Sequence, residues 1–154
     1  MPDYILVHTK DEYKIAASLF KEYTEWLNID LGFQHFESEL KDLNDMYSSP
    51  DGGILICKKD EQFIACVAVR KNLGKIAELK RMFVKPAYQS QGIGKRLLEE
   101  AISLAVKLNY TCIRLDTLNY MTPAINLYKK YGFYEIEAYY YNPNTTTVYF
   151  EKKL

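Results

Sequence analysis

The sequence predicts one α+β domain over residues 1–154, built on a mixed, mostly antiparallel sheet of roughly six or seven strands flanked by about four helices. Short β-like runs rich in Val, Ile, Tyr and Phe recur along the chain, and segments with apolar residues at steps of three and four separate them. A single strand–helix–strand unit in the second half predicts one parallel strand pair in an otherwise antiparallel sheet.

The composition limits the classes of partner. Lys and Arg (20) balance Asp and Glu (20), so we expect neither nucleic acid nor an anionic membrane as partner, because both require an excess of basic charge. No apolar run is long enough to span a bilayer and the N-terminus lacks a signal-peptide layout, so we expect a cytoplasmic protein. Cys57, Cys66 and Cys112 are expected to be buried free thiols, and with only His8 and His35, far apart, no metal is expected.

The N-terminal part is predicted to hold a strand and two helices. Tyr4–Val7 has the composition of a short strand, and Thr9 with Glu12 forms a capping box that begins a helix extending to Leu27. After a break at Asp30–Gly32, a second, shorter helix is predicted by the apolar spacing of Phe33, Phe36, Leu40 and Leu43. Two roles stay open for this second helix: a lid over a substrate, or a simple cover for the sheet.

Three antiparallel strands are predicted next. Ile54–Lys58 and Phe63–Arg70 form a hairpin around the polar turn Lys59–Glu61. A further turn at Asn72–Gly74 leads into the third strand, Lys75–Val84.

The crossover unit follows. An amphipathic helix runs from Gly92 to Leu108 and ends at Asn109, and the strand Cys112–Thr117 comes after it. This order predicts a right-handed connection between two parallel strands.

The C-terminal part is predicted to be one helix and two strands. Thr122 followed by proline begins a helix over Ala124–Tyr131, and Gly132 ends it in a left-handed conformation. Phe133–Ala138 and Thr147–Lys153 are the last two strands.

A glycine-containing loop, residues 89–94, stands between a strand and the long helix. Such a junction directs backbone N–H groups and the positive end of the helix dipole outward, so it predicts a phosphate or pyrophosphate site. The Rossmann pattern is excluded because Leu97 occupies the third glycine position. The Walker pattern is excluded because Arg96 follows Lys95 where Ser or Thr is needed.

The spacing Gln89-x-x-Gly92-x-Gly94 resembles the acetyl-CoA pyrophosphate loop of the GNAT superfamily of N-acetyltransferases. The order of the predicted elements is also similar to that of this family over nearly the whole chain. Glu78 lies eleven residues before Gln89, the separation at which members of the histone-acetylating type carry their catalytic glutamate.

A second motif supports the resemblance. Residues 124–133, with Tyr128 and Gly132, resemble the last helix of the family, whose tyrosine faces the sulfur of CoA. One position departs from the pattern: many members carry Asn where this chain has Met121, and Asn119 is out of register.

The resemblance implies acetyl-CoA as co-substrate, bound where the strand of Glu78 splays away from that of Cys112. The pantetheine arm would pair with the backbone near Met82, Phe83 and Val84 like an added strand. The implied pyrophosphate contacts are Gln89, Gln91, Gly92, Ile93, Gly94 and Lys95.

The resemblance also implies roles in catalysis. Glu78 is the candidate general base, acting directly or through water, and Tyr128 is the candidate general acid for the leaving thiolate. A backbone amide near Phe83 is the candidate donor to the developing oxyanion.

The sequence leaves several alternatives open for the residues that bind the acceptor. Either Arg70 or Arg81 could hold a carboxylate of the acceptor, and Tyr139 could wall its pocket, although solvated strand ends, packing and a homodimer contact are alternatives. Our hypothesis is an N-acetyltransferase for a small-molecule amine or amino-acid-like acceptor. The alternatives are a regulatory module that binds acetyl-CoA without turnover, and an acyltransferase for a different acyl group.

Overall fold

The computed structural model describes residues 1–28 and 36–154. The strands are β1 (Asp3–Leu6), β2 (Gly53–Lys59), β3 (Gln62–Leu73), β4 (Ile76–Val84), β5 (Cys112–Leu118), β6 (Tyr134–Ile136) and β7 (Thr147–Lys153). The helices are α1 (Lys10–Leu27), α2 (Phe36–Lys41), α3 (Leu43–Met46), α4 (Ile93–Lys107) and α5 (Thr122–Lys130), with a 3-10 turn, η2, at Pro86–Tyr88.

The described strands form one seven-stranded sheet in the order β1-β2-β3-β4-β5-β7-β6. Every neighbouring pair is antiparallel except β4 and β5, which run parallel and pair only over Ile76–Glu78 and Cys112–Arg114. The predicted α+β class and the single parallel pair are thus confirmed.

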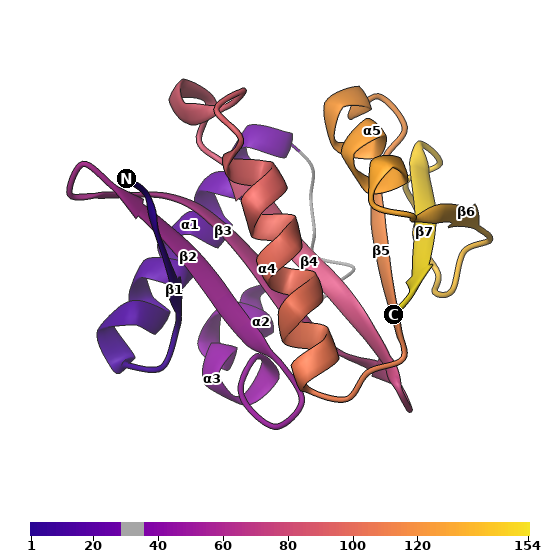
Figure 1. Ribbon diagram of the computed structural model, residues 1–154, viewed down its shortest axis with the longest axis horizontal. Helices are drawn as coiled ribbons and strands as arrows, with labels where there is room; N and C mark the ends of the chain where they lie inside the picture. The colour runs from indigo at the N-terminus through magenta and orange to yellow at the C-terminus, as the bar shows by residue number, and fades with distance from the viewer. Residues whose placement is uncertain (29–35) are drawn as a thin grey trace.

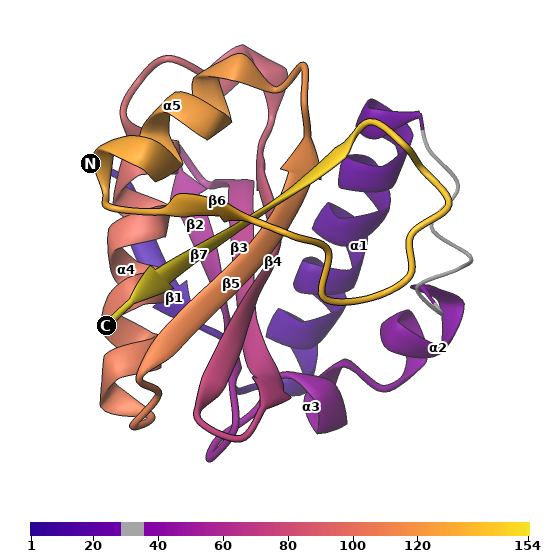
Figure 2. The same ribbon diagram turned by 90° about the vertical axis from the view of Figure 1, so that its right-hand side faces the viewer.

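Helices cover both faces of the sheet, with α4 on one side and α1 to α3 on the other (Figures 1 and 2). The α4 side buries an apolar cluster that includes Val67, Leu79 and Leu97. The α1 side buries a second cluster that includes Phe20, Ile56 and Phe83. Successive side chains of a strand point to opposite faces of the sheet, so one strand contributes apolar side chains to both clusters.

Several local predictions are confirmed in detail. The Glu12 amide donates to the Thr9 hydroxyl oxygen and the Thr9 amide donates to the Glu12 carboxylate, so the capping box is complete. Asp60 and Glu61 have φ values of 51° and 63°, the left-handed conformation of a tight hairpin turn between β2 and β3. Gly132 ends α5 at φ 92°.

The second helix differs from its prediction. A single helix from Phe33 to Leu43 was expected, but the described part contains two short helices, α2 and α3, with Asp42 between them. The predicted break at Asp30–Gly32 and the start at Phe33 lie outside the described residues. Apolar spacing predicted helical conformation correctly, but Asp42 carries no signal that is distinct from an ordinary exposed helical position.

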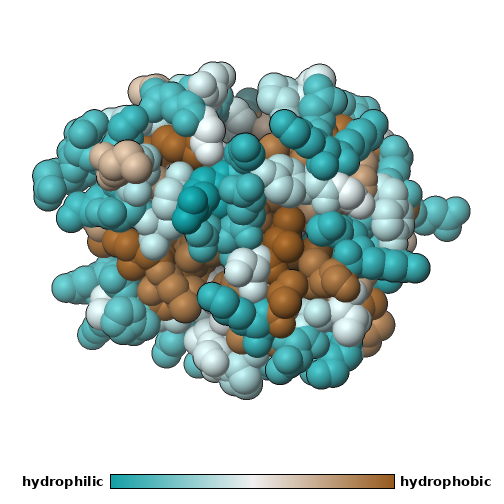
Figure 3. All heavy atoms as spheres, viewed as in Figure 1, coloured by the Kyte–Doolittle hydropathy of each residue, from teal (hydrophilic) through white to brown (hydrophobic). Residues whose placement is uncertain are grey.

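On the face that carries α4, hydrophobic residues gather mainly in the lower half of the view, among hydrophilic ones (Figure 3). Val106 of α4 is an exposed apolar residue. In the part of the chain that the structure describes, no helix has the length and apolarity needed to cross a membrane.

Candidate active site

The site begins where β4 and β5 stop pairing. Beyond Glu78 and Arg114, β4 continues beside β3 while β5 continues beside β7, so the two parallel strands diverge (Figure 1). No described strand pairs with the β5-facing edge of β4 from Leu79 to Val84. That edge therefore offers backbone N–H and C=O groups to an extended ligand.

A β-bulge distorts β4 at this point. Arg81 and Met82 lie opposite the single residue Val67 of β3, and Arg81 has φ 57°. The Cys66 thiol donates to the Arg81 carbonyl at 3.3 Å, which fixes the bulge from inside the sheet. The bulge interrupts strict alternation, and the consecutive residues Lys80 and Arg81 are both buried, Arg81 against α2.

Arg81 is fully engaged with α2. Its Nε and Nη2 donate to the two carboxylate oxygens of Glu39 at 3.0 and 2.8 Å, and both side chains are buried. The guanidinium also lies over the Phe36 ring, 5.4 Å from its centroid. We predicted Arg81 as one of two candidates for an acceptor carboxylate, but its geometry assigns it to holding α2 against the bulge.

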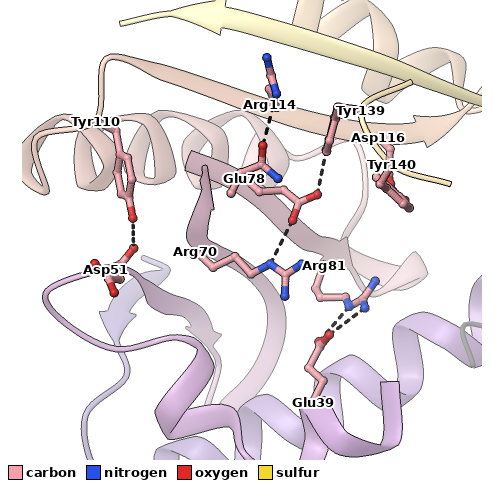
Figure 4. A network of polar contacts seen from close by, with 11 residues as sticks. Glu39, Asp51, Arg70, Glu78, Arg81, Tyr110, Arg114, Asp116, Tyr139 and Tyr140 are labelled. Carbon is pink, nitrogen blue, oxygen red and sulfur yellow. Dashed lines mark hydrogen bonds and ion pairs between the residues drawn. The ribbon is translucent and has the colours of Figure 1, made fainter. Parts of the chain in front are cut away.

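Glu78 lies at the centre of a second set of contacts (Figure 4). Its Oε1 accepts from Arg70 Nε at 3.0 Å and its Oε2 accepts from the Tyr139 hydroxyl at 2.8 Å. The Glu78 side chain is only 3% exposed. The structure thus brings together three predicted site residues, of which Tyr139 lies 61 positions from Glu78 in the sequence.

Arg70 retains binding capacity. Only its Nε contacts Glu78, and its two terminal nitrogens make no hydrogen bond to the residues that the structure describes. The side chain is half-buried beside Glu78 and points toward Arg81 in Figure 4. Of the two predicted arginines, Arg70 is the one with unused donors.

Sequence reasoning missed two polar residues beside Glu78. Asp116 of β5 accepts a short hydrogen bond from the Tyr140 hydroxyl, and Lys80 of β4 lies close enough to both carboxylates for their charges to act on it. Burial lowers the pKa of Lys80 to about 8, and burial raises the pKa of Asp116 above its ordinary value. A signal was present, because Arg114 and Asp116 alternate with apolar residues along a predicted strand.

The junction of β4 and α4 forms the predicted anion site. Ser90 and Gly92 have φ values of 64° and 82°, and α4 begins after Gly92 with no side-chain cap and no acidic residue in its first turn. The first helical bond is donated by the Arg96 amide to the Gly92 carbonyl at 3.1 Å. The amides of Ile93, Gly94 and Lys95 therefore have no intrahelical partner and suit an anion.

The loop side chains divide into two groups. Gln89 donates to the Val84 carbonyl at 3.0 Å, and Gln91 accepts from Lys59 at 2.8 Å, so these two side chains brace the loop. Lys95 is exposed, and Arg96 pairs with Glu100 at 2.9 Å. The side chain best placed to add positive charge for an anion is that of Lys95.

Tyr128 lies on the inner face of α5 and is 5% exposed. Its ring packs against Phe133 and Phe150, with centroids 5.7 and 6.5 Å away. Burial raises the pKa of its phenol, so the hydroxyl stays protonated at neutral pH.

A parallel strand pair that diverges beside an uncapped, glycine-led helix N-terminus defines a class of protein, the CoA-dependent acyltransferases. The comparison with known families agrees, because the model of the acetyltransferase (GNAT) family matches residues 20–133. The chain belongs to the GNAT family. It is an N-acetyltransferase that depends on acetyl-CoA as donor.

Relatives extend over most of the chain. An uncharacterised N-acetyltransferase of Dictyostelium discoideum is 34% identical over 92% of this chain and 93% of the relative. One of Schizosaccharomyces pombe is 37% identical over 90% of this chain and 85% of the relative. The PaiA N-acetyltransferase of Thermoplasma acidophilum, solved in complex with coenzyme A, has a TM-score of 0.74 at 20% identity and covers 100% of this chain and 99% of its own, which is a likeness of fold.

Proposed function

We propose that the protein transfers the acetyl group of acetyl-CoA to the amine of a small or amino-acid-like acceptor by direct attack. The observation that carries this proposal is that β4 and β5 diverge, and that two chemically different features lie beside the point of divergence. The uncapped start of α4 lies at one end, and the polar cluster of Arg70, Glu78 and Tyr139 lies on the opposite side of the sheet from α4.

The donor side fits the chemistry of acetyl-CoA. The amides of Ile93, Gly94 and Lys95 would bind the pyrophosphate, and the unpaired edge of β4 at Met82, Phe83 and Val84 would pair with the pantetheine arm. A Cβ added at Gly92 would meet no atom within 4 Å, so the loop leaves space there. Acetyl-CoA supplies the thioester whose acyl carbon accepts the amine.

The acceptor side is suited to a small molecule that carries a carboxylate. The two terminal nitrogens of Arg70, which no described residue accepts from, form a fork that matches a carboxylate in bidentate geometry. Glu78 holds the guanidinium in place through Nε. Tyr139 would form one wall, because its hydroxyl binds Glu78 and its ring lies 5.4 Å from the Arg114 guanidinium.

Two proton transfers complete the reaction. An amine with a pKa of about 10.4 is almost entirely protonated at pH 7, so a base near the acceptor must remove a proton before attack. The carboxylates of Glu78 and Asp116, on the two diverging strands, are the candidates for this base. We propose Tyr128 as the donor of the proton that the leaving thiolate takes, because its buried phenol is protonated over the working range.

The test of the proposal is thiol release from acetyl-CoA with pairs of amines that differ only in a carboxylate or a carboxamide. The wild type should prefer the carboxylate by about tenfold or more, since a charge-assisted hydrogen bond is worth roughly 1.5–3 kcal/mol. Arg70→Gln should lose that preference. The neighbouring exposed Lys71 serves as control, and Lys71→Gln should keep it. Equal use of both members of each pair by the wild type would contradict the assignment of Arg70.

A further inference from the structure

The candidate base predicted from the sequence is buried and already has a partner at each carboxylate oxygen. Both oxygens of Glu78 accept hydrogen bonds, one from Arg70 and one from Tyr139, and the side chain is 3% exposed. A carboxylate that takes a proton from an acceptor needs an oxygen within hydrogen-bond reach of it. Because Glu78 is almost wholly buried, an acceptor amine could reach it only if the residues packed around it moved.

Asp116 meets the requirement. It lies on β5, across the divergence from Glu78, and is half-buried. One carboxylate oxygen, Oδ2, accepts from the Tyr140 hydroxyl, and the other accepts no hydrogen bond from the described residues. Asp116 is therefore more exposed than Glu78 and keeps one oxygen that accepts from no described residue.

Tyr140 is held in place from several directions. The Asn142 side-chain amide donates to the Tyr140 oxygen at 3.3 Å and to the Thr147 hydroxyl at 3.1 Å. The Tyr140 ring packs edge to face against Tyr139 and Tyr149, with centroids 5.3 and 5.7 Å away. These contacts fix the hydroxyl that orients Asp116.

The charges that act on Asp116 come from every side of the site. Burial raises its pKa, and the cations around it oppose that effect. The groups that face it are Glu78, Lys80 and Arg81 of β4, Arg70 of β3, Tyr23 of α1, Tyr128 of α5, Tyr149 of β7, and Tyr139 and Tyr140 of the segment between β6 and β7. A base works best when its pKa lies near the working pH, so a raised value suits this role.

We propose that Asp116 is the catalytic base of this enzyme and that Tyr140 is the residue that positions it, while Glu78 orients Arg70. This inference rests on the proposed transfer to an amine. The acceptor ammonium gives one proton to this Asp116 oxygen, and the freed lone pair forms the C–N bond as the C–S bond breaks. The nitrogen sheds its second proton on becoming an amide, the thiolate takes up one proton, and Asp116 passes its own to water.

Two tyrosines offer a matched experiment, since Tyr140 donates to Asp116 and Tyr139 donates to Glu78. A hydrogen bond to a carboxylate favours its charged form, so Tyr140→Phe should raise the pKa of Asp116. The acidic limb of kcat/KM for the acceptor should then move to higher pH by about one unit. Tyr139→Phe should leave the limb where the wild type has it. A limb that moves with Tyr139→Phe and not with Tyr140→Phe would overturn the proposal in favour of Glu78.

Asp116→Asn provides the second measurement. It keeps the shape and an acceptor for Tyr140, so the fold and the thermal stabilisation by acetyl-CoA should persist, while kcat/KM at pH 7 falls by about a hundredfold or more. Retention of activity within a few fold would overturn the assignment. Failure of the wild type to acetylate any amine would instead overturn the proposed function, so the two failures are distinguishable.

Discussion

Replacing Gly92 by valine should abolish the stabilisation that acetyl-CoA gives to the fold. A Cβ at Gly92 would point into space with no protein atom within 4 Å, and that space is where the loop would receive the pyrophosphate. At a ligand concentration about 100 times the dissociation constant, binding adds about 2.7 kcal/mol to the free energy of unfolding. For a protein of this size that corresponds to a rise in Tm of roughly 5–11 °C.

Gly74 provides the control for backbone strain. It lies in the turn between β3 and β4 at φ 55°, Gly92 has φ 82°, and neither has an atom within 4 Å of an added Cβ. Valine at either position should cost roughly 1–3 kcal/mol in the ligand-free protein. Thermal unfolding with and without acetyl-CoA should show the full rise in Gly74→Val and little or none in Gly92→Val. An equal rise in both variants would refute the assignment of the loop.

Three further outcomes are expected. Tyr128→Phe should lower kcat in the thiol-release assay and leave acetyl-CoA affinity nearly unchanged, because the ring still packs and only the hydroxyl is lost; an unchanged kcat would make Tyr128 a core residue only. Glu39→Gln leaves the buried Arg81 guanidinium without its counter-charge, so it should lower the free energy of unfolding measured in urea by about 3 kcal/mol or more. The control is Glu100→Gln, in a more exposed ion pair of similar distance, which should lower it by about 0.5 kcal/mol or less. The pKa of Lys80 is lowered to about 8 in the folded state, so between that pH and about pH 10.4 the unfolded chain binds more protons than the folded one. The free energy of unfolding of the wild type should therefore rise over this range relative to that of Lys80→Met. A difference in free energy of unfolding that does not change with pH would contradict this.

Features set by neighbouring residues were predicted well from the sequence. The capping box of Thr9 and Glu12, the turn at Asp60 and Glu61 and the stop at Gly132 each depend on a few consecutive residues. The single parallel pair was also predicted, because a strand, a helix and a second strand in succession join parallel strands.

The contacts that build the acceptor side were not predicted. Tyr139 reaches Glu78 across 61 positions in the sequence, and Arg81 reaches Glu39 across 42. Both contacts depend on strand register, which the bulge at Arg81 alters. An arginine at φ 57° has no local sequence signal, because that conformation is usually marked by glycine or asparagine.

The central claim is that the protein moves an acetyl group from CoA to an amine, and the most direct measurement follows the acetyl group itself. The wild type is incubated with isotope-labelled acetyl-CoA and an amine that supports thiol release, and labelled acetyl-amine and free thiol are quantified together by mass spectrometry and thiol titration. One labelled amide should form for each thiol released. Thiol release without labelled amide, or acetyl-CoA binding without either product across the amine panel, would contradict it.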